Sequence, residues 1–160
     1  MDALTLIIAQ HDEIDQLITE IEAESLIERK QLLFDELAAQ LAAHAVMEEK
    51  LFYPMVLATQ TQEFLLAEDH IAIRRALSEL AAIDVDDPAF DTKLAVLTEE
   101  IEHHARDEEE EIVFPKLRRL LSQEQLEALG IEMEALHERL LAKPMARTQP
   151  PLHAVSAASP

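Results

Sequence analysis

Two segments of the sequence place a glutamate four residues after a histidine. They are His44-Ala-Val-Met-Glu48 and His104-Ala-Arg-Asp-Glu108. If both segments are helical, each pair lies on one helix face, with Cβ atoms about 5–6 Å apart. An imidazole nitrogen and a carboxylate oxygen at that separation can ligate one metal ion or share two neighbouring ions. The spacing therefore predicts two halves of a metal centre.

Two further histidines precede these pairs at nearly equal distances. His11 lies 33 residues before His44, and His70 lies 34 residues before His104. Each pair also leads to an aromatic residue and a proline, which are Tyr53-Pro54 and Phe114-Pro115. This repeat predicts two helix pairs related by a pseudo-twofold axis.

Such a repeat gives each of two metal ions two histidines and allows Glu48 and Glu108 to bridge them. Nitrogen ligands with bridging carboxylates suit iron, and the same ligand types also suit zinc, manganese and copper. Without a metal, burying these groups in an apolar core costs several kcal/mol unless each is paired. The predicted metal ligands are His11, His44, Glu48, His70, His104 and Glu108.

Four long segments could carry these ligands, because their apolar residues recur at alternating steps of three and four, the period of a helix that faces a bundle core. The expected helices span residues 4–24, 27–59, 63–82 and 89–121. The candidate ligands fall in gaps of the apolar stripes; His11, for example, lies between Ile7 and Ile14. The sequence therefore predicts an all-α, up-down-up-down four-helix bundle in which every helix directs a histidine at the core.

A fifth, shorter helix is expected over residues 122–143, because Ser122 and Gln125 have the spacing of a capping box. Gly130 interrupts its apolar pattern. Residues 144–160 are rich in Pro, Ala and Ser and are expected to form a disordered tail. The predicted organisation is a bundle over 1–121, an appended helix over 122–143 and the tail.

Composition limits the possible partners. The 160 residues include 33 Asp and Glu against 13 Lys and Arg, giving a net charge of −20 that repels nucleic acid and attracts metal cations. With no Cys, any metal must bind nitrogen and oxygen ligands. No apolar run approaches membrane-spanning length, and the first ten residues have no basic region. We expect a cytoplasmic protein with neither nucleic-acid nor membrane partners.

Four stretches of the sequence resemble the hemerythrin, or HHE cation-binding, family. They are QHDEID around His11, HAVMEEKLFYP from His44, EDHIAIRRAL around His70 and EHHARDEEEEIVFPKL around His104. The resemblance covers about residues 4–121. It implies a hemerythrin-like bundle that holds two iron ions in a di-iron centre with an oxo or hydroxo bridge. It also implies activities that range over oxygen binding, oxygen or nitric oxide sensing, iron handling and peroxide chemistry.

Two positions depart from the family pattern. Oxygen-carrying hemerythrins have a further histidine one turn after the third-helix ligand, where this chain has Arg74. That departure argues against simple reversible oxygen carriage and leaves a coordination position for water, substrate or another side chain. The second departure is one extra residue before the proline that follows the fourth-helix pair. Either Glu108 or Glu109 could then bridge; a π-bulge would align Glu109, but we favour Glu108 because its one-turn spacing needs no special backbone.

The remaining polar residues have simpler interpretations. His103 points about 100° away from His104, and His137 and His153 are expected to face solvent. Tyr53, the only tyrosine, is expected to serve in packing. Arg74 is expected to pair with a surface acid such as Glu68 or Glu79.

Three functions remain open on these observations. The leading one is a di-iron protein that binds or reacts with a small diatomic molecule or peroxide, in sensing, scavenging or iron homeostasis. The second is a di-iron enzyme, such as a peroxidase or an iron donor for iron–sulfur cluster repair. The third is an acidic helical adaptor with a structural zinc site. Because the first two differ only in turnover, the sequence leaves enzyme activity undecided.

Overall fold

The computed structural model describes residues 1–59 and 64–143, and every regular element in these two ranges is helical. In chain order the elements are α1 (Ala3–Ala23), α2 (Ile27–Met47), η1 (Glu48–Phe52), α3 (Tyr53–Ala58), α4 (Phe64–Ala81), α5 (Phe90–Glu102), η2 (His103–Val113), α6 (Phe114–Leu120) and α7 (Gln123–Leu141). The all-α prediction is confirmed. The predicted tail over 144–160 lies outside the described residues.

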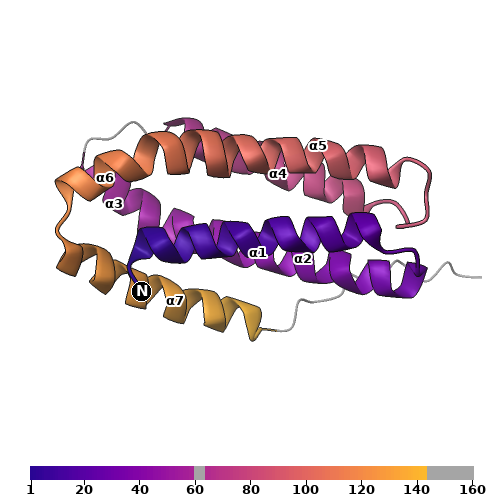
Figure 1. Cartoon of the computed structure of the whole chain (residues 1–160), viewed down its shortest axis with the longest axis horizontal. Helices are drawn as coiled ribbons and strands as arrows, with labels where there is room; N and C mark the ends of the chain where they lie inside the picture. The colour runs from indigo at the N-terminus through magenta and orange to yellow at the C-terminus, as the bar shows by residue number, and fades with distance from the viewer. Residues whose placement is uncertain (60–63, 144–160) are drawn as a thin grey trace, which may run out of the picture.

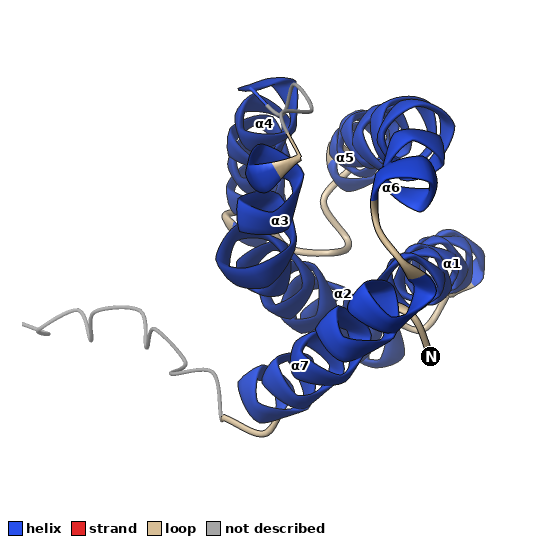
Figure 2. Cartoon of the chain, turned by 90° about the vertical axis from the view of Figure 1, so that its left-hand side faces the viewer, coloured by secondary structure: helices blue, strands red, loops and turns tan. Residues whose placement is uncertain are grey.

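The predicted up-down-up-down bundle is also confirmed. α2, η1 and α3 follow one another without a break and form one rod, as do α5, η2 and α6. Together with α1 and α4 they make the four rods of the bundle (Figure 1). The fifth helix, α7, lies against α1 and α2 on the outside of this bundle, as the end-on view in Figure 2 shows.

Local sequence explains where two of the helices begin. The Asp2 carboxylate accepts hydrogen bonds from the backbone N–H groups of Leu4 and Thr5, both at 3.0 Å, and so caps α1. The predicted capping box before α7 is present: the Ser122 hydroxyl accepts from the Gln125 backbone, and the Gln125 side chain accepts from the Ser122 backbone. These contacts satisfy N–H groups that have no partner within the helix.

Both composite rods contain a π-helical segment just before their aromatic-proline step. The i→i+5 hydrogen bonds that define such a segment include Tyr53 N–H to the Glu48 carbonyl in η1 and Phe114 N–H to the Glu109 carbonyl in η2. η1 has 5 residues and η2 has 11. The sequence suggested a π-bulge only in the fourth helix, and only as the less favoured alternative. The wider turns change which side chains point inward.

The hydrophobic core has two parts. One cluster includes Ile7, Phe52 and Phe114 and extends onto α7, whereas the other includes Ile14 and continues to the opposite end of the bundle. His11 lies between these clusters on α1 and is buried. A buried polar layer therefore crosses the bundle between two apolar clusters, and the apolar residues on either side fix the helices that carry it.

Gly130 lies where α7 crosses the start of α1. A Cβ atom at this position would collide with the carbonyl oxygen of Met1 and would come within 2.9 Å of the Ala3 nitrogen. The glycine that weakens the apolar pattern in the sequence therefore permits a close approach of two backbones. α7 continues through it without a break.

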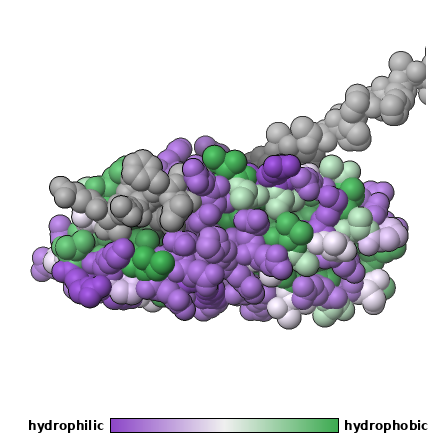
Figure 3. Space-filling model, turned by 90° about the horizontal axis from the view of Figure 1, so that it is seen from above, coloured by the Kyte–Doolittle hydropathy of each residue, from purple (hydrophilic) through white to green (hydrophobic). Residues whose placement is uncertain are grey.

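The surface is mainly hydrophilic on the face drawn in Figure 3, where hydrophobic residues form small separate groups. Within residues 1–59 and 64–143, no helix combines the length and the apolar character that crossing a membrane requires.

Candidate metal centre

The polar layer holds one histidine from each rod of the bundle. They are His11 on α1, His44 on α2, His70 on α4 and His104 in η2, and all four are buried. The structure thus brings together the four histidines that the sequence singled out. Burial of this many imidazoles needs compensating partners.

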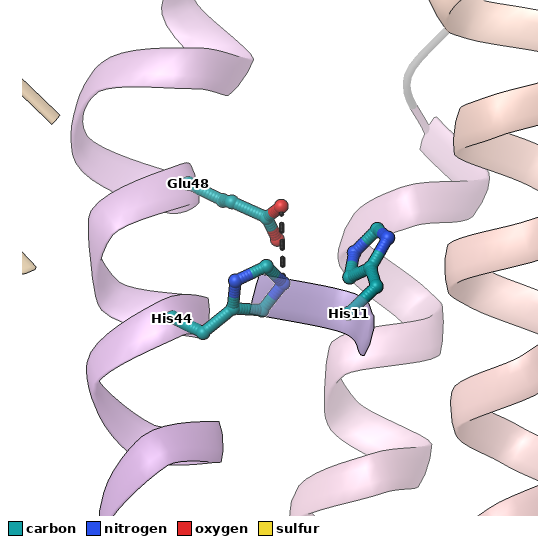
Figure 4. Close-up of side chains that lie close together, drawn as sticks. All are labelled: His11, His44 and Glu48. Atoms are coloured by element: carbon teal, nitrogen blue, oxygen red, sulfur yellow. Dashed lines mark ion pairs between the residues drawn. The ribbon is translucent and has the colours of Figure 1, made fainter. Parts of the chain in front are cut away.

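The first half of the layer comprises His11, His44 and Glu48. One potential ligand atom from each of these residues lies within 4.8 Å of the other two. His44 Nε2 is 3.2 Å from Glu48 Oε1, and the two imidazole rings meet edge to face with their centroids 5.0 Å apart. Figure 4 shows the three side chains converging from α1 and from the α2–η1 rod. This geometry suits a single cation.

The second half comprises His70, His104 and, again, Glu48. Glu48 Oε2 is 3.1 Å from His70 Nε2 and 3.7 Å from His104 Nε2. The two Nε2 atoms are 3.0 Å apart. Because its other oxygen faces the first half, the geometry of the Glu48 carboxylate would allow it to bridge two cations.

A second carboxylate spans the two halves, and it belongs to Glu109. This side chain is fully buried, with Oε2 3.4 Å from His11 Nε2 and Oε1 3.7 Å from His104 Nε2. The Glu108 side chain is 19% exposed and lies 3.9 Å from the surface residue His103. Our preference for Glu108 as the inward carboxylate is therefore corrected in favour of Glu109.

The π-helical backbone of η2 explains this correction. In an ordinary α-helix the residue four positions after His104 would share its face. η2 is wound with i→i+5 hydrogen bonds, so the residue five positions later takes that place. The extra residue before Pro115 is absorbed in this way.

Tyr53 also belongs to the layer, although the sequence suggested only a packing role. Its hydroxyl lies 2.9 Å from His70 Nε2, 3.4 Å from His104 Nε2 and 3.5 Å from Glu48 Oε2. The side chain is buried. A phenol oxygen therefore occupies the second half of the layer, on the side of the cluster that contains Phe52 and Phe114.

The protonation of the metal-free layer is uneven. Burial lowers the pKa of His44 to about 3, so its imidazole is neutral. Burial also opposes the charged form of His104, but the attraction of Glu109 and other carboxylates raises its pKa to about 10. Burial disfavours the anions of Glu48 and Glu109. Hydrogen-bonding contacts with the imidazoles of His104 and His70 nevertheless hold the pKa of Glu48 well below its usual range. Burial and then the charge on Glu48 raise the pKa of Glu109.

The donor set fits a pair of cations. Among the described residues, His11 Nε2, Glu48 Oε1 and both carboxylate oxygens of Glu109 are buried without a hydrogen-bond partner. The nitrogen and oxygen atoms converge on two neighbouring positions, which is the chemistry of imidazole- and carboxylate-ligated metal ions. A bound cation would compensate for the burial of these polar atoms.

Metal binding is expected to release protons, because His104 carries a proton below its pKa of about 10 while an imidazole must be neutral at the ligating nitrogen. Burial opposes the charged form of His11, but contact with Glu109 raises its pKa as well. The apparent affinity should thus rise with pH through the neutral range toward pH 10. Calorimetric titration of metal-free protein with Zn²⁺ in two buffers of different ionisation enthalpy measures this release. Equal binding enthalpies in both buffers would contradict it.

A small apolar cavity of about 120 Å³ adjoins the layer. The four histidines form one wall of this cavity, and its other lining residues include Ile14, Leu41, Ile73 and Ile101. Arg74 also lines it, and half of the Arg74 side chain is exposed. The Arg74 guanidinium is 2.7 Å from Glu49 Oε1. This partner is an acidic residue, as expected, but not Glu68 or Glu79.

The other histidines lie outside the layer. His103 is half-exposed and pairs with Asp107, as expected for a residue on the outer face of η2. The expectation that His137 faces solvent was wrong, because α7 packs this residue against the bundle and buries it. His153 lies outside the described residues.

Histidine and carboxylate side chains in the core of a four-helix bundle define a class of helical metal-binding proteins. The profile of the family described as "Hemerythrin HHE cation binding domain" matches residues 2–117. The chain belongs to this hemerythrin family, which confirms the resemblance found in the sequence.

Two proteins similar to this chain illustrate the relationship. One solved structure, a hemerythrin HHE cation-binding domain-containing protein from Mycobacterium kansasii, matches with a TM-score of 0.77 at 28% identity and covers 88% of both chains. A relative from Nostoc sp. (strain PCC 7120), named a DNA nickase, is 28% identical over 144 residues. The match includes 88% of this chain but spans only 40% of the length of that relative.

Proposed function

We propose that this chain is a non-haem di-iron protein that binds or reacts with O₂, NO or peroxide. The proposed ligands are His11 and His44 for the first ion, His70, His104 and Tyr53 for the second, and Glu48 and Glu109 for both. The observation that carries this proposal is that each of two buried carboxylates reaches both histidine pairs. Bridging carboxylates with terminal imidazoles favour iron. A pair of ferrous ions would supply electrons and open coordination positions to a small molecule.

The chain's own residues would select what reaches the site. The adjoining cavity of about 120 Å³ has space for only a few atoms, and its apolar lining disfavours charged molecules. Burial of the histidines and carboxylates keeps bulk water away from them. These features support a small, weakly polar ligand such as O₂ or NO, and they also admit neutral hydrogen peroxide.

Stopped-flow absorption tests this function. Iron-loaded, reduced protein should change its visible spectrum on mixing with at least one of O₂, NO or hydrogen peroxide. A carrier or sensor would return the molecule unchanged, whereas an enzyme would consume many equivalents per chain. If the spectrum responds to none of the three, the proposed function is wrong.

Tyr53 provides a second test, because a phenolate bound to ferric iron gives a charge-transfer band in the visible region. Tyr53 is the only tyrosine in the chain, so any such band is assignable to it. Tyr53→Phe keeps the aromatic ring that packs near Phe52 and removes the hydroxyl alone. We expect the variant to retain most of its iron and to lose the band. A wild-type spectrum in the variant would show that Tyr53 is not a ligand.

The name of the Nostoc relative raises the question of DNA, but we retain the prediction that this chain does not bind it. The net charge of −20 repels phosphate groups.

An acidic helical adaptor with a structural zinc site remains the alternative from another class of function. Carboxylates shared between two histidine pairs favour a two-ion site over a single structural zinc.

A further inference from the structure

All four histidines face the centre of the layer with Nε2, and on the opposite side each Nδ1 atom meets an oxygen from a neighbouring helix. Three of these contacts are hydrogen bonds: His44 Nδ1 with Gln10 Oε1 at 2.7 Å, His70 Nδ1 with Glu49 Oε1 at 3.0 Å, and His11 Nδ1 with Glu110 Oε1 at 2.8 Å. The fourth, His104 Nδ1 with Asp69 Oδ2, is an ion-pair contact of 3.6 Å, beyond hydrogen-bond distance. Carboxylate and amide carbonyl oxygens only accept hydrogen bonds. At the three hydrogen-bonded histidines Nδ1 must therefore carry a proton, and a neutral imidazole protonated there keeps the lone pair of Nε2 free for a metal.

These contacts follow one direction around the bundle. α1 supplies Gln10 to the histidine of α2, and η1 supplies Glu49 to that of α4. α4 in turn supplies Asp69 to the histidine of η2, and η2 supplies Glu110 to that of α1. The three hydrogen bonds and the Asp69–His104 ion-pair contact form a closed circuit in which each rod faces the histidine of the next.

The positions of these four residues in the sequence explain the circuit. Each one is adjacent to a member of the central layer: Gln10 to His11, Glu49 to Glu48, Asp69 to His70, and Glu110 to Glu109. Neighbouring residues on a helix point about 100° apart. When one residue of the pair faces the centre of the bundle, the other faces the adjacent helix, where a histidine lies.

Two of these carboxylates have further anchors. Arg74 forms an ion pair with Glu49 at 2.7 Å. Arg106 forms ion pairs with Glu110 and with Asp15 on α1, both at 2.6 Å. Both arginines are partly exposed, so each ion pair alone contributes little to stability. Their geometric effect is to fix the direction of carboxylates that already contact the histidines.

We propose that Gln10, Glu49, Asp69 and Glu110 are positioning residues that together couple the geometry of the metal centre to the packing of the four rods. The inference rests on the proposed metal function. Gln10 and Glu110 orient the histidines of the first ion, whereas Glu49 and Asp69 orient those of the second. Loss of one partner should therefore weaken one ion specifically, even though the altered residue ligates neither.

The test is titration of the metal-free chain of residues 1–160 with Co²⁺, followed by absorption spectroscopy. Glu110→Ala and Gln10→Ala should weaken one of the two binding events by about 10- to 100-fold, and Glu49→Ala and Asp69→Ala should weaken the other. Glu110→Gln keeps an oxygen acceptor and should recover most of the affinity. Glu111→Ala, the next residue of η2 with an exposed side chain, is the matched control.

Paramagnetic NMR of individual histidines distinguishes a change in the orientation of one ring from a general loss of protein stability. In the cobalt-loaded protein, Glu110→Gln should shift the paramagnetic N–H resonance of His11 more than those of the other histidines. This comparison does not depend on whether Glu110→Ala folds, because it uses only the Gln variant, which retains the shape of the side chain. Wild-type protein that binds no Co²⁺ would overturn both the proposed function and the circuit. Two normal binding events in the wild type and in all four alanine variants would overturn the circuit alone.

Discussion

Glu109→Gln is expected to lose most of its iron, whereas Glu108→Gln should keep both ions. Glu109 is fully buried and reaches a histidine of each half of the layer, so its loss removes one proposed ligand from each ion. Glutamine fills the same volume but lacks the negative charge that offsets the charge of the cations. Glu108 instead lies 3.9 Å from the half-exposed His103. Iron per chain, measured by plasma emission after purification from iron-replete cells, compares the two variants.

The pair is a matched experiment, because the two residues are adjacent in η2 and undergo the same chemical change. Iron loss only in Glu108→Gln would contradict the inward placement of Glu109 and would imply an ordinary helical turn after His104. Full retention of iron by both variants would show that neither carboxylate is needed.

Glu48→Gln is expected to remove both ions and much of the stability that they provide. Glu48 contributes one carboxylate oxygen to each half of the layer. A ligand present at 1,000 times its Kd stabilises the folded state by about 4 kcal/mol. For a chain of this length, losing that contribution lowers Tm on the order of 10 °C. Thermal denaturation monitored by circular dichroism, with and without added metal, measures the effect.

The metal-free proteins provide the control for this prediction. Without metal, Glu48→Gln should melt somewhat below the wild type, because contacts with the imidazoles favour the ionised Glu48 carboxylate in the folded state. His103→Ala, next to a proposed ligand but half-exposed, should retain the full metal-dependent increase in Tm. An equal metal-dependent increase in wild type and Glu48→Gln would remove Glu48 from the ligand set.

The bundle was predictable because its signals are local. The apolar period of three and four residues places helices within a few residues of their observed ends, and the capping box of Ser122 and Gln125 marks the start of α7. The same period showed that the four histidines point inward, since each replaces an apolar residue in a stripe. Glu48 followed from its one-turn spacing to His44.

The parts that could not be predicted depend on backbone irregularity and on contacts between helices. The choice between Glu108 and Glu109 depends on the π-helical winding of η2, for which the sequence gives only an ambiguous count of residues before Pro115. Tyr53 enters the layer through a contact with His70 on another rod. No spacing within one helix reveals such a contact.

Two further differences arise from the packing of α7. Gly130 resembles a helix breaker in the sequence, but it is the point at which α7 meets the start of α1. His137 is buried by the same packing.

The polar neighbours of the central ligands, in contrast to these contacts of α7, can be recognised in the sequence, because each is adjacent to a ligand. Gln10-His11, Glu48-Glu49, Asp69-His70 and Glu109-Glu110 form a pattern that could be sought in other chains.

The proposal that the polar layer holds two iron ions is tested most directly by the metal content of the protein. Protein purified from iron-replete cells should contain close to two iron ions per chain by elemental analysis. Its visible absorption should be bleached by reduction and should return with oxygen. One zinc ion per chain with no iron, or a colourless protein that does not respond to oxygen, would contradict the di-iron assignment.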